Sequence, residues 1–167
     1  MPNPKLETKK DVEVKDCAKD ILNSFWGVEI LDLYEPIYHL DWFIDKGSRG
    51  TPVFAEFKAR YMHSEKFPSI FLSMHKFNKM VEFNNNVGAI GLFVVWCADR
   101  LMYAKIVPDE QVFSRLPTVS IGGRHDRGIS GDVEPMLSIP VEKFKTIHLG
   151  GPTNDIYLQR KHKSQKT

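Results

Sequence analysis

The chain has only two cysteines and no closely spaced pair of cysteines or histidines. Cys17 and Cys97 are eighty positions apart. Structural zinc sites and redox motifs need ligands or thiols at short, fixed spacings, so the sequence supports neither. We expect both thiols to be buried small residues, and no disulfide is needed.

Other common signals are also missing. An almost wholly apolar run at 87–98 is too short to cross a bilayer. No glycine fingerprint follows the first strand-like segment, which argues against a doubly wound dinucleotide fold. The segment 1–5 lacks the apolar core of a secretory signal, so we expect a cytoplasmic protein.

Neither positive nor negative charge is in large excess, since the formal net charge of the 167 residues is only +2. A nucleic-acid partner would therefore need a local concentration of positive charge. The length fits one domain, which we expect at 1–158. A basic tail follows at 159–167, and we expect it to be disordered.

The most informative motif is Glu56-Phe57-Lys58, on a strand-like run at 53–59 that follows another strand-like run at 38–45. Side chains alternate between the two faces of a strand, so a hairpin must have the right register to bring two acids together. With a four-residue loop at 47–50, Asp41 lies opposite Glu56 and Phe43 opposite Phe54. His39 would then face Lys58, while Phe57 points to the other face, into a core.

Two facing carboxylates repel each other, and a hard divalent cation between them would relieve the repulsion. Asp41, Glu56 and the backbone carbonyl of Phe57 would make a plausible Mg²⁺ site. Lys58 would orient or deprotonate a water, or neutralise charge growing on a phosphate. Alternatively, Glu-x-Lys is simply a solvated strand face, as it is in many proteins.

With these residues and their flanking elements, the region of about 9–107 resembles the PD-(D/E)XK nuclease superfamily. Asp41, Glu56 and Lys58 match its motif, with Leu40 where the superfamily name has proline. The resemblance implies an α/β (α+β) fold with a mixed central sheet flanked by helices and an αβββαβ core. It also implies a DNA endonuclease or exonuclease that uses Mg²⁺, with Mn²⁺ able to substitute. The resemblance to small phage-encoded or Holliday-junction-resolvase-like members also implies that the protein acts in the host cytoplasm and forms a homodimer.

The first helix is expected to begin at Thr8, with Asp11 three residues on as its capping partner. Its apolar face would comprise Val14, Ala18, Ile21, Leu22 and Phe25. In the resolvase branch of the superfamily, a Glu on this helix often joins the metal site. The resemblance therefore implies a metal-binding and catalytic role for Glu13, although a solvated position on a highly charged helix is an equal alternative.

A second helix is expected from about Phe67-Pro68 to Asn84, because proline suits the first helical position. Its apolar stripe would comprise Ile70, Met74, Phe77 and Val81. Beside it would run a row of Ser69, Ser73, Lys76 and Met80. Ser73 or Lys76 on this row could contact a DNA phosphate, or the row could simply face solvent.

Three further strands complete the expected sheet. The run 87–98 is typical of a buried central strand, and a tight turn would join it to a second strand at 100–107. The segment 28–35 is predicted to be an edge strand. The segment 121–132 is rich in Gly, Arg and Asp and is expected to be a mobile loop, in which Arg124 and Arg127 could contact DNA or remain solvated. Order is expected to resume at 139–144.

Two readings without catalysis stay open. The chain could be an inactive DNA-binding or interaction module on the same fold, although all three motif residues are present. The hairpin motif could also be accidental. A partner surface would then be formed by exposed aromatics, namely Tyr34, Tyr38, Trp42 and Tyr61.

Overall fold

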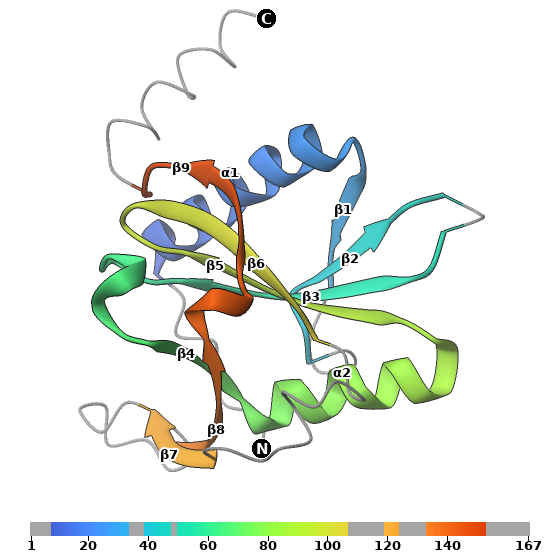
Figure 1. The fold of residues 1–167 in the computed structure, drawn as a ribbon. Coiled ribbons are helices and arrows are strands. Elements are labelled where there is room, and N and C mark those ends of the chain that lie inside the picture. The colour runs from blue at the N-terminus through green and yellow to red at the C-terminus, as the bar shows by residue number, and fades with distance from the viewer. Residues whose placement is uncertain (1–7, 34–38, 48–49, 107–118, 124–132, 153–167) are drawn as a thin grey trace, which may run out of the picture.

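The computed structural model describes residues 8–33, 39–47, 50–106, 119–123 and 133–152. Its main element is a six-stranded sheet in the order β1-β2-β3-β5-β6-β9 (Figure 1). Only β3 and β5 are parallel, and the other neighbours are antiparallel, so the sheet is mixed as predicted. Its strands are β1 (Glu29–Asp32), β2 (Trp42–Asp45), β3 (Val53–Ala59), β5 (Ile90–Trp96), β6 (Arg100–Ile106) and β9 (Lys145–Leu149).

A smaller antiparallel sheet packs on one side of the first. It has the order β4-β8-β7, with bounds Ser69–Ser73, Val133–Pro140 and Val119–Gly123. Helix α2 (Met74–Val87) follows β4 directly and leads into β5. Two short 3₁₀ turns complete the described elements, η1 (Ser64–Lys66) before β4 and η2 (Val141–Lys143) between β8 and β9.

Helix α1 (Lys9–Trp26) begins as predicted. The Thr8 hydroxyl accepts a hydrogen bond from the Asp11 backbone N–H, and the Asp11 carboxylate accepts one from the Thr8 N–H, which satisfies two of the orphan donors of the first turn. Gly27 ends the helix with a left-handed φ of 61°. The predicted apolar face is buried except for Phe25, which is exposed; Trp26 packs on the core at that end instead.

The predicted helix at 67–84 is wrong in its first part. Residues 69–73 form strand β4, in which Ile70 and Leu72 are buried while Phe71 is exposed. This alternation has the period of two of a strand, and β8 supplies its hydrogen bonds from more than sixty positions away. Ser69 and Ser73 therefore do not share a helix face with Lys76. Residues 121–123, which were predicted to lie in a loop, belong to β7 instead, and the rest of that segment, 124–132, lies outside the described residues.

Two apolar clusters cover the two faces of the six-stranded sheet. One packs against α1 and includes Trp42, which is 0% exposed and so cannot belong to an aromatic partner surface. The other packs against α2, β4 and β8, around Phe93 and Met80. Cys17 and Cys97 are both buried, as expected, and neither forms a disulfide among the described residues. Within the described residues, no helix is long and apolar enough to span a membrane.

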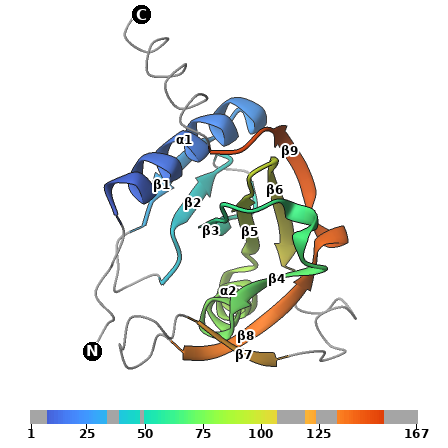
Figure 2. The same ribbon diagram turned by 90° about the vertical axis from the view of Figure 1, so that its left-hand side faces the viewer.

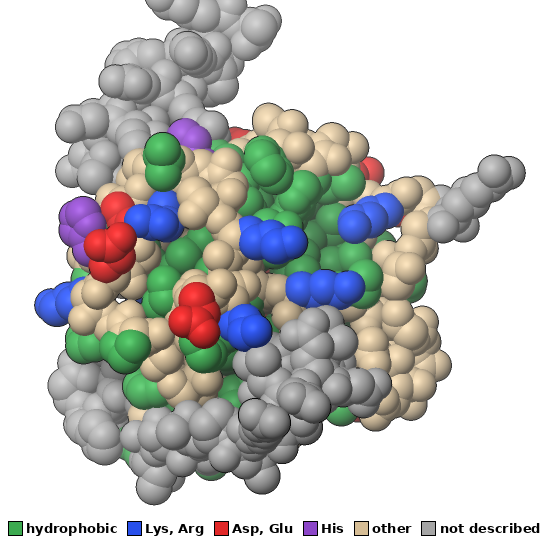
Figure 3. Space-filling view, in the orientation of Figure 1, with side chains coloured by type: hydrophobic (Ala, Val, Ile, Leu, Met, Phe, Trp, Pro, Cys, Tyr) green, Lys and Arg blue, Asp and Glu red, His purple; other side chains and the backbone are tan. Residues whose placement is uncertain are grey.

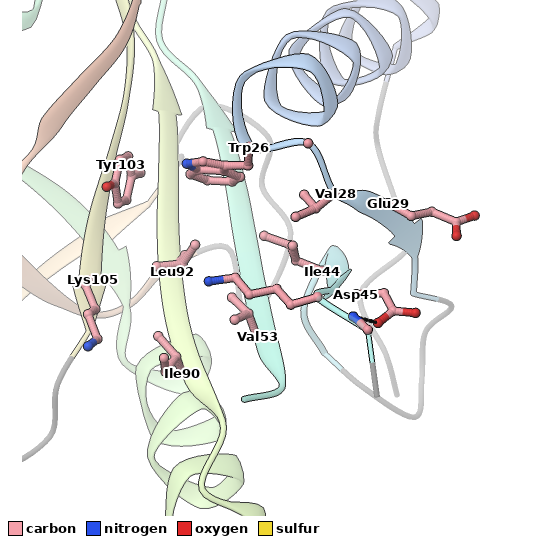
Figure 4. A pocket seen from close by; sticks show the side chains of 13 residues that line it. Trp26, Val28, Glu29, Ile44, Asp45, Val53, Ile90, Leu92, Tyr103 and Lys105 are labelled. Atoms are coloured by element: carbon pink, nitrogen blue, oxygen red, sulfur yellow. Dashed lines mark hydrogen bonds between the residues drawn. The ribbon is translucent and has the colours of Figure 1, made fainter. Parts of the chain in front are cut away.

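Helix α1 leaves part of its face of the sheet open. Beyond Trp26 lies a hollow of about 790 Å³, with Ile44, Val53 and Leu92 on its floor and Lys105 at its edge (Figure 4). In the space-filling view, hydrophobic side chains come to the surface between separate lysine or arginine side chains, without a continuous basic stripe (Figure 3). Strand alternation places Glu56 and Lys58 on the opposite face from Val53, so this hollow is not next to the motif.

Candidate active site

The β2–β3 hairpin has the predicted register. Phe43 pairs with Phe54, and Trp42 with Ala55. The Gly50 N–H donates to the Gly47 carbonyl at 3.0 Å, which closes the four-residue turn. The core-facing side of β3 is also as predicted, because the Phe57 ring lies 5.1 Å from that of Trp42.

The hairpin ladder stops at the pair of Trp42 and Ala55, so Asp41, which precedes Trp42 in the chain, lies just beyond it. The Asp41 N–H donates to the Ala55 carbonyl at 3.0 Å, and the Asp41 carboxylate accepts the Phe57 N–H at 3.0 Å. His39 does not continue the ladder opposite Lys58. It has a positive φ of 56°, and its ring packs edge-on against His75 of α2, with 4.9 Å between the ring centroids. At this bend the Asp41 side chain lies against β3, where it accepts the Phe57 N–H.

Asp41 is held as a carboxylate by positive charge. Its burial alone would raise its pKa, but Lys15 of α1 donates a hydrogen bond to Oδ1 and pairs with it. Together with the Phe57 N–H and the charge of Lys76, this contact lowers the pKa of Asp41 below its usual value.

Glu56 is in the opposite situation. Burial and the neighbouring Asp41 charge raise the pKa of Glu56 to about 8, against the opposing charge of Lys76. Lys76 Nζ lies 3.2 Å from Glu56 Oε2, but this buried oxygen accepts no aligned hydrogen bond. A buried carboxylate oxygen without a hydrogen-bond partner is an uncommon feature that calls for an explanation.

Lys58 lies on the same face of β3 as Glu56. Burial lowers the pKa of Lys58 to about 8, and the charges of Arg60 and Lys76 contribute, while Glu56 and Glu134 oppose the shift. Glu134 comes from β8 and accepts a hydrogen bond from Ser73 Oγ at 2.6 Å. The site is therefore formed by both sheets and both helices (Figure 2).

The side chains present are of the chemical type that binds a divalent metal ion. Two adjacent carboxylates offer the oxygen ligands that Mg²⁺ prefers, and the neighbour that a cation would replace at Glu56 Oε2 is the Lys76 ammonium group at 3.2 Å. In the part of the chain described, no three acidic, His or Cys side chains form a group that could hold a metal. Glu13 is half-buried on α1 and is not grouped with the two acids; from this helix it is Lys15 that reaches Asp41.

Of the predicted DNA contacts, the structure places two. Lys76, in the first turn of α2, lies beside Glu56, and Ser73 precedes that helix and faces Glu134. Arg124 and Arg127 lie outside the described residues. The contributions of Lys15 and Glu134 to the site were not predicted. Lys15 borders the buried stripe of α1 just as Glu13 does, so the sequence does not distinguish the two. Nothing in the sequence connects Glu134 to a motif some eighty residues earlier.

The geometry defines a class of protein: a mixed sheet with Asp just before one strand and Glu-x-Lys on the next is the arrangement of PD-(D/E)XK nucleases. The sequence matches the model of the family described as "Phage putative PDDEXK endonuclease" over residues 1–147. The chain belongs to this phage PD-(D/E)XK endonuclease family.

Other comparisons add less. The chain is similar to a solved structure of Hjc, a Holliday junction resolvase from Archaeoglobus fulgidus, with 20% sequence identity and a TM-score of 0.39. The match covers 50% of this chain and 71% of the resolvase chain. No curated protein matches the sequence.

Proposed function

We propose that this chain hydrolyses phosphodiester bonds in DNA with the help of Mg²⁺, and that Mn²⁺ can substitute. The observation that carries the proposal is the pair of Asp41 and Glu56, with side chains that are only 13% and 16% exposed, on the side of β3 that carries Lys58. A cluster of this kind is unfavourable for folding alone, because burial and the Asp41 charge both disfavour the ionised form of Glu56. Binding a cation would offset that cost.

Asp41 and Glu56 would hold the metal, with the Phe57 carbonyl as a further ligand. When bound, the ion would supply Lewis-acid activation of the phosphate and of a water. Asp41 is fixed for this role, because the Phe57 N–H orients one of its oxygens. Glu56 must lose its proton to bind a cation, and its raised pKa makes metal binding stronger as the pH rises toward about 8.

Lys58 would accept the proton of the attacking water. With a pKa of about 8, its amine is partly neutral near pH 8 and can accept a proton from the attacking water. In the protonated form the same Nζ stabilises negative charge that develops on the phosphate. The partial burial of Lys58 and its position on the same face of β3 as Glu56 support both roles.

Lys15 and Lys76 would act as exchangeable counter-charges. Each pairs with one acid, Lys15 with Asp41 and Lys76 with Glu56. Once a divalent cation neutralises these acids, both ammonium groups can pair with phosphates of the DNA instead. The chain thus has local positive charge at the site despite its net charge of only +2.

The test is cleavage of labelled linear duplex, single-stranded, forked and four-way-junction DNA, with Mg²⁺, Mn²⁺ or a chelator. We expect metal-dependent cutting that is lost in Lys58→Met and Asp41→Asn. Lys79→Met, which changes an ion-paired lysine of α2 away from the acids, is the matched control. Binding without cutting under every condition would refute the nuclease and support the inactive DNA-binding alternative.

A further inference from the structure

A second hollow lies on the same face of the sheet as Glu56 and Lys58. It has a volume of about 370 Å³ and is formed mostly by the segment that joins β3 to β4, drawn in green in Figure 2. Its walls are largely apolar, with Ile70, Phe67 and Phe71 among them, and Ser69 and Arg60 are among its polar groups. This volume is near the lower end of the ~300–1,000 Å³ of ligand pockets, which suits a small group and excludes a duplex.

Arg60 connects this hollow to the active site. It follows Lys58 by two positions, so the two side chains share a face about 6.6 Å apart along the strand. The Arg60 N–H donates to the Trp96 carbonyl at 2.8 Å, which extends the β3–β5 ladder as far as this residue. Among the described residues, no carboxylate pairs with the Arg60 guanidinium, although Lys15, Lys76 and Arg100 all have acidic partners.

Two phenylalanine rings are available at the same hollow. Phe67 is 52% exposed and Phe71 is 38% exposed, while Ile70 between them is buried. Arg60 also lines the hollow, and Lys66 Nζ lies 5.8 Å from the Phe67 ring centroid, so the hollow combines aromatic surface with basic side chains. Proteins bind unpaired nucleotides with this combination: bases stack on aromatic rings, and basic side chains follow the backbone.

We propose that this hollow binds one unpaired nucleotide of the DNA strand that is cut, with the base against Phe67 and Phe71 and the adjacent phosphate on Arg60. The inference rests on the proposed function, because it is the position beside Lys58 that makes a DNA strand the occupant. It assigns a substrate class: duplexes with an unpaired nucleotide next to the cleavage position, such as flaps, overhangs and forks, are bound in preference to continuous duplex.

The test is binding in chelator, where no cutting occurs. The probe is a duplex with a short single-stranded flap that carries 2-aminopurine at the first unpaired position; 5′ and 3′ flaps are compared. Reference DNAs are the continuous duplex with the same label and a flap with an abasic site at that position. The variants are Phe67→Ala and Arg60→Gln. The matched control is Phe25→Ala, which removes another exposed ring, on α1.

We expect 2-aminopurine fluorescence to fall on binding of one flap, and Phe67→Ala to weaken that binding roughly tenfold. Phe25→Ala should have no effect, and the abasic flap should bind wild type and Phe67→Ala equally. Arg60→Gln should weaken binding of the base-containing flap and of the abasic flap alike, and it should reduce the salt dependence of that binding. Equal affinity of wild type for base-containing and abasic flaps, or equal effects of Phe67→Ala and Phe25→Ala, would overturn the inference.

The outcome is separable from that of the proposed function. Metal-dependent cleavage with no Phe67-dependent base contact would refute the pocket and leave the nuclease intact. Base-dependent binding in chelator without cleavage in any metal would support the pocket and refute the nuclease. Circular dichroism of each variant checks that it is folded, which we expect because the two phenylalanines that are changed are exposed.

Discussion

Glu56→Gln should stabilise the metal-free protein, and the gain should depend on pH. The folded pKa of Glu56 is about 8, against 4.5 for an unperturbed Glu. Between these values the folded chain binds more protons than the unfolded chain, so wild-type stability falls as the pH rises through this window. At about 1.36 kcal/mol per pKa unit, the penalty is ~3 kcal/mol at pH 7 and approaches ~5 kcal/mol above pH 8.

Glutamine has nearly the same shape and carries no charge, so the variant escapes this penalty. For a chain of this size, ~3 kcal/mol corresponds to a rise in Tm of roughly 6–12 °C at pH 7, and the difference should nearly disappear at pH 4.5. The measurement is thermal unfolding of wild type and variant in chelator between pH 4.5 and 8.5. Glu142→Gln, at an exposed position of η2, is the matched control and should shift Tm little at any pH.

Addition of Mg²⁺ gives a second readout. A cation that binds the folded state through Glu56 should raise the Tm of wild type and leave that of Glu56→Gln nearly unchanged. A variant that is less stable than wild type at pH 8, or whose advantage is independent of pH, would refute the reasoning. It would show that the Lys76 pairing outweighs the burial and repulsion of the carboxylate.

Three further predictions concern activity and packing. Asp41→Asn and Lys58→Met should each lower cleavage at least 100-fold in single-turnover assays while the protein stays folded; retained cutting would contradict the assigned roles. Thr8→Ala should lower stability by about 1 kcal/mol in urea unfolding, because it removes the helix cap, and an unchanged midpoint would show that the cap contributes nothing. Gly91→Ala should cost roughly 1–3 kcal/mol, because a Cβ there would lie 2.9 Å from the Met80 Cβ; a neutral result in the same assay would mean that α2 shifts freely.

The sequence predicted the parts of the site that depend on local pairing. The hairpin register follows from a short turn and from alternation, and both are visible within twenty residues. The strand β5 could be predicted because it is apolar on both faces, as a central strand is. These features set the positions of Asp41, Glu56 and Lys58.

The parts that the sequence did not reveal depend on distant partners. Ile70 and Met74 are four positions apart and imitate a helix stripe, yet residues 69–73 pair with β8. The lysine that reaches Asp41 is a neighbour of the predicted Glu13, and only the packing of α1 on the sheet decides which of them faces the acid. Glu134 follows a stretch of the chain with few apolar residues, where periodicity carries little information.

The order of the elements along the chain has a consequence for how the site is assembled. The contact between Asp41 and the Phe57 N–H spans 16 positions, so the two acids come together as soon as the hairpin forms. The Lys76 counter-charge arrives only with α2, and the Ser73–Glu134 hydrogen bond spans 61 positions. During synthesis the two acids are therefore made before Lys76, which balances Glu56, and β8 later adds Glu134, whose charge acts on Lys58. The complete charge pattern of the site therefore exists only after the chain has been made through β8, and nascent chains that end before β8 lack it.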